Sequence, residues 1–148
     1  MADQKIVTIV PTYERLDLVR QMVTSYRETA LDAPSIIAVV QGKDDGSEGW
    51  LRHNDVTVLR SPEPLSFAKA CNFAAGTDTN ADWFLLANND LVFQPGWLDA
   101  LKAHLTDDGA DIIGAQLFYP DGTIQHVGKW LTLDWQPFHI LRYQKPAD

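Results

Sequence analysis

The chain has 148 residues, of which 45% are apolar and 22% charged, with a formal net charge of −8 and one cysteine, Cys71. This composition is that of a soluble single-domain protein, and an acidic chain without a Lys/Arg cluster excludes a nucleic-acid or anionic membrane partner. A lone cysteine excludes an intramolecular disulfide, and no apolar run suits a signal peptide or a membrane span, so we expect a cytoplasmic protein.

Short runs of β-branched residues alternate with helical patterns along the chain. Strands are predicted at 5–10, 35–40, 56–59, 83–88 and 111–118, where Val, Ile, Leu and Phe cluster. Helices are predicted from Leu16 to Tyr26, at 66–76 with Ser66 as N-cap, and from Pro95 to Leu105. The alternation predicts an α/β fold, a Rossmann-like and mainly parallel sheet flanked by helices.

Polar side chains follow the predicted strands at the points where the strands end. Residues 11–15 follow the first strand, 41–47 the second, and Asn88, Asn89 and Asp90 the fourth. Ligands of parallel sheets bind outside the carboxyl ends of the strands, so these loops form a candidate binding site. Asn, Asp and Gly are also ordinary turn residues, and composition alone leaves a plain loop open. A hairpin turn, however, would more often contain glycine.

Five segments carry a more specific signal when they are taken in order. They read IVTIVPTYER (6–15), DDGS (44–47), LSFAKACNFAAG (65–76), WFLLANNDLVFQPGWLDAL (83–101) and GAQLFYPDGTIQHVG (114–128). Together they resemble the family 2 glycosyltransferases of the GT-A fold, in particular the rhamnosyltransferase-like members. The resemblance implies an unusually short member with a single domain over 1–148. Its nucleotide-binding half would be 1–90, and its acceptor-side half 91–148 would be shorter than usual.

The resemblance also implies where a nucleotide-sugar would bind. Tyr13 would lie against the base, and either Gln41 or one of the two aspartates that follow it would read the base edge. Arg15 and Lys69 would meet phosphates, although each also fits an exposed surface position. The full set of implied donor-binding residues is Pro11, Thr12, Tyr13, Glu14, Arg15, Gln41, Asp44, Asp45, Lys69, Asn72, Asn88 and Asn89.

A divalent cation is the expected cofactor, because an acidic protein needs one to hold a diphosphate. Mg²⁺ or Mn²⁺ suits carboxylate, phosphate and water ligands. Asp90 is the one carboxylate in the triplet, and Asn88 stands where the family often has Asp, which weakens the metal site. His139 follows the QHVG phrase at the distance seen in similar members and is the second candidate ligand. His126, within that phrase, fits a structural or an acceptor-side position.

The general base is the least specified part of the site. Longer members supply it from a region beyond the length of this chain, which leaves Asp134 and Asp121 as candidates. Asp121 precedes a glycine and also fits a turn. The aromatic neighbours of Asp134 (Trp130, Trp135 and Phe138) fit either a sugar-stacking wall or ordinary core.

Three hypotheses follow. The first is a metal-dependent inverting glycosyltransferase that moves a sugar from a UDP-sugar, such as UDP-glucose or UDP-galactose, to a glycan or another hydroxyl acceptor. The second is a truncated domain that binds the donor without transfer, and the third is a non-catalytic carbohydrate-binding module. A dinucleotide oxidoreductase is disfavoured because no G-x-G-x-x-G follows the first strand. Exposed sheet edges are compatible with a homodimer.

Overall fold

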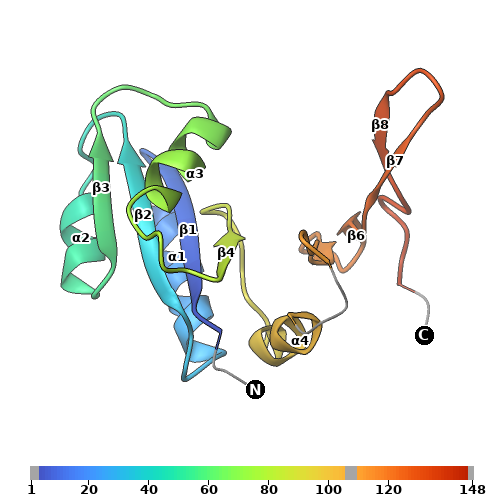
Figure 1. Ribbon diagram of the computed structural model, residues 1–148, viewed down its shortest axis with the longest axis horizontal. Helices are drawn as coiled ribbons and strands as arrows, with labels where there is room; N and C mark the ends of the chain where they lie inside the picture. The colour runs from blue at the N-terminus through green and yellow to red at the C-terminus, as the bar shows by residue number, and fades with distance from the viewer. Residues whose placement is uncertain (1–3, 106–109, 147–148) are drawn as a thin grey trace. The chain divides into compact units, whose positions relative to one another are not determined.

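The computed structural model describes residues 4–105 and 110–146 and divides the chain into two compact units, 1–101 and 102–148. The first unit is built on a four-stranded sheet (Figure 1). The strands are β1 (Ile6–Tyr13), β2 (Ser35–Gln41), β3 (Thr57–Ser61) and β4 (Trp83–Leu86). All neighbours are parallel, in the order β3-β2-β1-β4.

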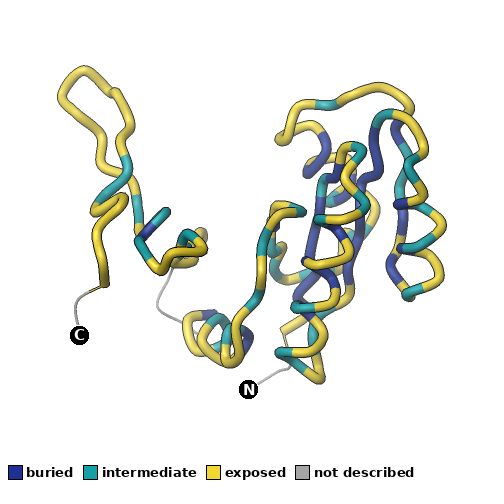
Figure 2. The backbone as a smooth tube through the Cα atoms, turned by 180° about the vertical axis from the view of Figure 1, so that it is seen from behind, coloured by how far each residue is buried: buried dark blue, intermediate teal, exposed yellow. Residues whose placement is uncertain are grey.

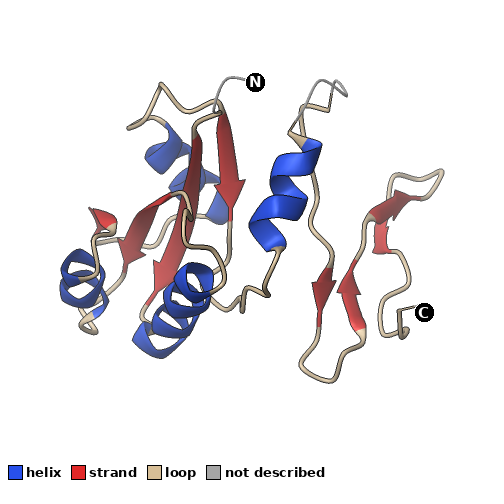
Figure 3. Ribbon diagram, turned by 90° about the horizontal axis from the view of Figure 1, so that it is seen from below, coloured by secondary structure: helices blue, strands red, loops and turns tan. Residues whose placement is uncertain are grey.

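Helices cover both faces of this sheet (Figure 3). The helices α1 (Leu16–Glu28) and α2 (Ser47–His53) bury Val19, Met22 and Leu51 against one face, and α3 (Phe67–Ala75) covers the other. β1 and β2 are buried on both faces, as a central parallel strand requires, and they form the dark centre of Figure 2. The fold is therefore the predicted α/β architecture, with a parallel sheet between helices.

The segment that follows β4 is anchored on α1 by aromatic rings. Phe93 meets Tyr26 edge to face at 5.0 Å, and Trp97 lies 4.8 Å from Tyr26 and 4.7 Å from Phe93 between ring centroids. The Phe93 amide also donates to Ser25 Oγ at 3.1 Å. The helix α4 (Trp97–His104) begins at this cluster. The apolar run after Asp90 thus packs on α1 and fixes the chain that follows the triplet.

The second unit consists of two small antiparallel pairs. β5 (Leu117–Phe118) pairs with β6 (Ile124–His126), and β7 (Lys129–Leu131) pairs with β8 (Pro137–His139). The C-terminal part of the unit bonds back to β6. The Ile124 amide donates to the Gln144 carbonyl and the Tyr143 amide donates to the Ile124 carbonyl, both at 2.8 Å. Most side chains of the β7–β8 hairpin are exposed, as the yellow tube in Figure 2 shows.

Several predicted boundaries are wrong. The strand predicted at 111–118 is reduced to Leu117–Phe118 and is antiparallel, since it pairs with a neighbouring hairpin strand and not with the parallel sheet. The helix predicted from Pro95 begins at Trp97, where the Trp97 amide bonds to the Gln94 carbonyl. The helix α2 was not predicted, because seven residues are too short to show a helical period.

In the described ranges, 4–105 and 110–146, no helix combines the length and the apolar character needed to cross a bilayer.

Candidate functional site

The carboxyl edge of the sheet brings the predicted loops together. In the strand register, Tyr13 at the end of β1 is paired with Gln41 at the end of β2, which is paired with Ser61 at the end of β3. The loop after β4 reaches the same edge, because Asn89 Nδ2 donates to Thr12 Oγ1 at 3.0 Å. Residues that are far apart in sequence therefore meet at one rim, as the sequence predicted for the ends of parallel strands.

The first loop lies across the second. Glu14 has a left-handed backbone (φ 45°), and its Oε1 accepts a hydrogen bond from the Lys43 amide at 2.7 Å. Tyr13 is about half exposed, with a relative accessibility of 49%, whereas Thr12 is buried. Gly42 permits this approach, since a Cβ at that position would lie 2.7 Å from Glu14 Oε1 and 2.8 Å from Tyr13 Cε2. The Tyr13 ring is thus left open to a planar ligand while its neighbours hold the loop.

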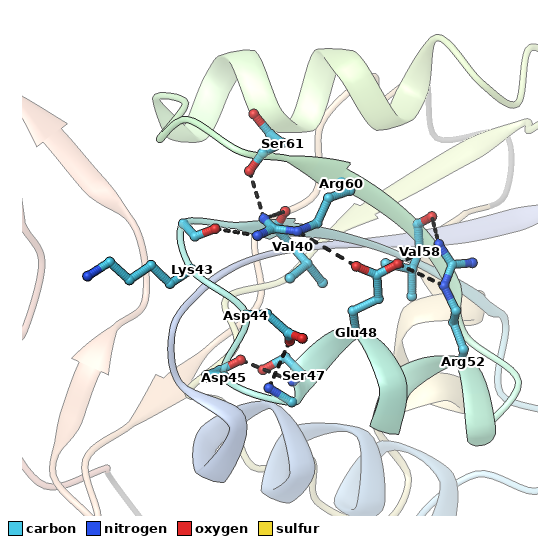
Figure 4. Close-up of polar contacts among 12 residues, drawn as sticks. Val40, Lys43, Asp44, Asp45, Ser47, Glu48, Arg52, Val58, Arg60 and Ser61 are labelled. Atoms are coloured by element: carbon cyan, nitrogen blue, oxygen red, sulfur yellow. Dashed lines mark hydrogen bonds and ion pairs between the residues drawn. The ribbon is translucent and has the colours of Figure 1, made fainter.

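The two aspartates of the second loop have different surroundings (Figure 4). Asp45 uses both oxygens structurally: Oδ2 accepts from the Leu16 amide at 2.8 Å, and Oδ1 accepts from the Ser47 amide at 3.0 Å. Asp44 is exposed and makes a local bond from the Gly46 amide to Oδ1, at 2.9 Å. Of the two, Asp44 is the carboxylate that a ligand at this rim can reach.

Asp45 serves as the cap for two helices at once. Neither α1 nor α2 has a side-chain cap of its own, and Asp45 accepts the first amide of each. Partial burial raises the pKa of Asp45, but the hydrogen bonds from Ser47 and from the Leu16 amide outweigh it, so the pKa lies below its ordinary value. A charged carboxylate at two helix N-termini also complements both helix dipoles.

Gln41 is committed to a structural bond. Its side chain is buried at 5%, and its Oε1 accepts a hydrogen bond from the Leu65 amide at 2.6 Å, which ties the end of β2 to the start of the α3 connection. The sequence left open whether Gln41 or an aspartate reads the base. Gln41 Oε1 thus already accepts one hydrogen bond, whereas Asp44 is exposed, and which of them reads the base stays a prediction.

Arg60 is a residue of this edge that the sequence analysis missed. Its guanidinium donates to the Val40 carbonyl at 3.0 Å, to the Ser61 carbonyl at 2.8 Å and to the Gly42 carbonyl, and its Nε lies 3.7 Å from Glu48 Oε2 (Figure 4). Arginine can bind several carbonyls at once because its planar group carries five donors. The signal was an arginine at the end of a predicted strand, directly at the carboxyl edge.

The triplet after β4 divides into one anchored and two exposed residues. Asn89 is held by Thr12, whereas Asn88 and Asp90 are exposed. Asp90 is close enough to Arg15 to raise the pKa of that guanidinium, although the larger cause is the two-bond pair of Arg15 with Asp17, at 2.9 and 2.7 Å. Asp90 is thus left exposed at the rim, and its role as a metal ligand stays a prediction.

A divalent cation at this edge stays a prediction, and the protein would offer it only a small donor set. Asp90 would supply the carboxylate, Asn88 could supply an amide oxygen, and Mg²⁺ typically takes one or two protein carboxylates with phosphate and water. Within residues 4–105 and 110–146, no group of three or more His, Cys, Asp or Glu side chains is arranged to hold a metal alone. The ligand's own oxygens would therefore have to complete the coordination.

The remaining predicted residues of the first unit lie on α3. Lys69 and Asn72 are exposed on this helix, and Ser66 caps it as predicted, with a bond of 3.3 Å from the Lys69 amide to Ser66 Oγ. The free exposure of both side chains agrees with a ligand contact and equally with a solvated helix surface. Their role in binding stays a prediction.

The two candidate bases both lie in turns of the second unit. Asp121 Oδ1 accepts from the Thr123 amide at 2.9 Å and from Thr123 Oγ1 at 2.7 Å, and these bonds lower the pKa of Asp121. Asp134 accepts from Thr132 Oγ1 in the β7–β8 turn. The contacts of Asp121 are those of a turn residue, and a lowered pKa makes a weaker base.

The aromatic residues near Asp134 are exposed. Trp130, Trp135 and Phe138 have relative accessibilities of 63%, 77% and 49%, so the alternative that they form ordinary core is wrong for the described structure. Exposed rings of this size can stack on sugars or other apolar surfaces. The sugar-stacking role stays a prediction.

The two histidines of the second unit are in contact. His126 Nδ1 and His139 Nδ1 lie 3.2 Å apart. Burial, followed by the charges of Arg142, Lys129 and His126, lowers the pKa of His139. Because Asp90 belongs to the first unit and His139 to the second, their predicted sharing of one cation stays a prediction.

The chain is similar in sequence to a known family and to known proteins. Residues 7–145 match the sequence model of the family described as Glycosyl transferase family 2. The chain is 33% identical over 128 residues to an uncharacterized protein, y4gI, of Sinorhizobium fredii, and 29% identical over 131 residues to the O-antigen biosynthesis protein RfbC of Myxococcus xanthus. These alignments cover 81% and 84% of this chain but only 14% and 10% of the relatives, so the chain spans a small part of their length.

Solved structures of TarS from S. aureus share the fold. The structure of TarS 1-349 superposes with a TM-score of 0.57 at 18% identity, over 68% of this chain and 32% of TarS 1-349. A second TarS structure gives a TM-score of 0.53 at 17% identity, over 78% of this chain and 24% of the other. At these identities the likeness concerns the fold alone.

Proposed function

The chain belongs to glycosyl transferase family 2, and from this premise we propose that it binds a nucleotide-diphosphate sugar, of the UDP-sugar class, and transfers the sugar to an acceptor hydroxyl with inversion. The observation that carries the proposal is the bond from Asn89 to Thr12, 3.0 Å long, which joins the triplet to the end of β1. Through this bond the loop with the exposed carboxylate Asp90 reaches the rim that also carries the exposed Tyr13 ring and the exposed Asp44 side chain.

Each exposed side chain has a proposed place along the donor. Tyr13 stacks on the base, and Asp44 accepts from the base edge, since Gln41 and Asp45 are occupied by the protein itself. Arg15 lies near the phosphates in this proposal, because Asp90 would hold their cation and the charge of Asp90 contributes to the raised pKa of Arg15. The remaining predicted contacts, Lys69 and Asn72 among them, would line the donor from α3.

Asp90 is the proposed ligand for Mn²⁺ or Mg²⁺, with Asn88 beside it. The cation, when bound, would offset the diphosphate charge and act as a Lewis acid toward the leaving nucleotide. Asp90 would hold it at the rim, and the Thr12–Asn89 bond would fix the loop that presents Asp90. His139, the second ligand implied by the resemblance, lies in the other unit.

For transfer, the acceptor oxygen would bond to the anomeric carbon while the bond from that carbon to the diphosphate oxygen breaks. The acceptor proton would pass to a carboxylate, and Asp134 is the proposed base in preference to Asp121. Asp121 receives two bonds from Thr123 that lower its pKa, which reduces its power to take up a proton.

A calorimetric titration of UDP tests the donor site. We expect binding in Mn²⁺, loss of binding in EDTA, and at least about tenfold weaker binding in Asp90→Asn, because that change removes the only charged ligand. Asp99→Asn, an exposed aspartate of α4, is the matched control and should bind as the unchanged chain does. Equal affinity of Asp90→Asn and Asp99→Asn, or binding that survives EDTA, would refute the metal-dependent site.

Donor binding without transfer is the second candidate function. It is favoured by one observation, that Asp121 and Asp134 are each bonded to a threonine of their own turn. Release of UDP from UDP-glucose and UDP-galactose, measured with and without sugar acceptors, separates the two. Binding with no release under any condition would favour the second candidate.

A further inference from the structure

Two imidazoles of the second unit are in contact, and this contact has no part in the proposed donor site. His126 is the last residue of β6, and His139 is the last residue of β8. Their Nδ1 atoms are 3.2 Å apart, and their rings stand nearly perpendicular, at 83° with 5.3 Å between centroids. The two rings thus bring the same nitrogen, Nδ1, into close contact.

The backbone around the pair is tied on both sides. His139 is paired with Lys129 in the β7–β8 ladder, and the Ile140 amide donates to the Gly128 carbonyl at 3.1 Å. On the other side, two bonds of 2.8 Å join Ile124 to residues 143 and 144. The two histidines therefore approach each other from elements that the same unit fixes, and a site built this way is better defined than one on free loops.

The spacing of the two nitrogens fits adjacent ligands of a metal ion. With a metal–nitrogen bond of about 2.0–2.1 Å, two ligands of a tetrahedral zinc site lie about 3.3–3.4 Å apart. Ligands at right angles, with the same bond lengths, lie about 2.8–3.0 Å apart. The observed 3.2 Å falls between these values. Imidazole nitrogen suits Zn²⁺, Co²⁺, Ni²⁺ and Cu²⁺ better than it suits Mg²⁺.

The surroundings leave room for further ligands. His126 lines a cavity of about 280 Å³ together with Gln116, Val127 and three small residues, 114, 115 and 128. His139 is not among the lining residues, so waters or an anion would have to reach the pair from the His126 side to complete the coordination. The positive charges of Lys129 and Arg142 near His139 oppose a bare cation, so the site would need an anionic co-ligand such as phosphate.

We propose that His126 and His139 are the protein ligands of a binding site for a transition-metal cation of the Zn²⁺ and Co²⁺ class. All of its protein ligands lie in the second unit, and it does not depend on the proposed transferase function. His139 then serves this site and not the cation of Asp90. The same 3.2 Å contact could be made by one neutral imidazole that donates to the other, which is the outcome that would overturn the proposal.

Cobalt titration of the full chain tests the site, because Co²⁺ bound by imidazole in a site of low coordination number absorbs visible light far more strongly than the aqua ion. We expect one equivalent of Co²⁺ to bind and to be displaced by Zn²⁺. His126→Gln and His139→Gln should each bind at least about tenfold more weakly, since even changes behind a metal ligand cost about 10–100-fold. His53→Gln, at the exposed end of α2, is the matched control and should bind normally.

Asp90→Asn separates this site from the proposed donor site, and it should leave cobalt binding unchanged. Loss of cobalt binding in Asp90→Asn, or in His139→Gln but not His126→Gln, would overturn the proposal, as would a spectrum that stays that of the aqua ion. Nitrogen NMR of the unchanged chain tests the site without any substitution, so the misfolding of a variant cannot affect its result. Added Zn²⁺ should shift the Nδ1 signals of both His126 and His139, and shifts confined to other histidines would also overturn it.

Discussion

Removal of the Asp45 carboxylate should weaken the fold of the first unit, because Asp45 caps two helices. Asp45 accepts the first amide of α1 and the first amide of α2, at 2.8 and 3.0 Å. Loss of a helix cap typically costs about 0.5–2 kcal/mol, so losing the cap of two helices at once should cost about 2 kcal/mol. We therefore expect Asp45→Ala to lower the free energy of unfolding by that amount.

Two variants make the test specific. Asp45→Asn keeps one acceptor oxygen but turns an amide group toward the other helix. It should therefore lose at least half of the stabilisation that the carboxylate gives. Asp44→Ala is the matched control, because Asp44 is exposed and accepts a local bond from the Gly46 amide. Exposed changes of this kind usually stay within about 0.5 kcal/mol.

The assay is urea unfolding of the full chain followed by helical circular dichroism, at pH 7 and at lower pH. The pKa of Asp45 is lower in the folded chain than its ordinary value of 3.8. Its contribution is therefore complete above that ordinary value and is lost as the pH falls below 3.8 through the lowered pKa of the folded chain. The difference between the unchanged chain and Asp45→Ala should shrink over that window. Equal stability of Asp45→Ala and Asp44→Ala at pH 7 would refute the reasoning.

Three further predictions concern single contacts. Gly42→Ala should destabilise by about 1–2 kcal/mol in urea unfolding, because φ is +77° and a Cβ would lie 2.7 Å from Glu14 Oε1; unchanged stability would contradict it. Tyr26→Phe should cost about 1–2 kcal/mol in the same assay, since the buried hydroxyl bonds at 2.6 Å to a threonine of β1 and at 3.0 Å to a carbonyl. A loss no greater than that of an exposed substitution would argue against this. Arg15→Ala should raise the pKa of Asp17 from about 2 toward 3.8, measured by NMR titration, because the bonds from Arg15 are the main cause of the low value. A pKa that stays near 2 would show another cause.

The sequence predicted the sheet well because each strand and helix of that sheet carries its own signal. IVTIV and SIIAVV are apolar on both faces, and such runs suit only central strands that helices cover on both sides. Ser66 was identified as the N-cap of α3 because its side chain accepts within its own helix. Local chemistry decided these elements, and local chemistry is visible in sequence.

The misses share one cause, which is that tertiary contacts decided the structure. α2 is short and takes its cap from Asp45, which also caps α1 in another part of the chain, so no local signal marked it strongly. The strand predicted at 111–118 has the right composition, but its partner is a hairpin strand that begins at Ile124. Arg60 was overlooked since its hydrogen-bond acceptors are backbone carbonyls, and the residue types in a sequence do not reveal which carbonyls lie together.

The carboxyl edge separates residues that hold loops from residues that remain exposed, and this division says which property a substitution should change. The side chains of Asn89 and Gln41 bond to other parts of the protein, so their substitution should first lower the free energy of unfolding. Tyr13, Asp44 and Asp90 stay exposed beside them, so their loss should appear first in affinity for a nucleotide. Resemblance alone grouped all five as ligand contacts. Because the anchoring residues also fix the loops, a fall in affinity counts as evidence of contact only where the free energy of unfolding is unchanged.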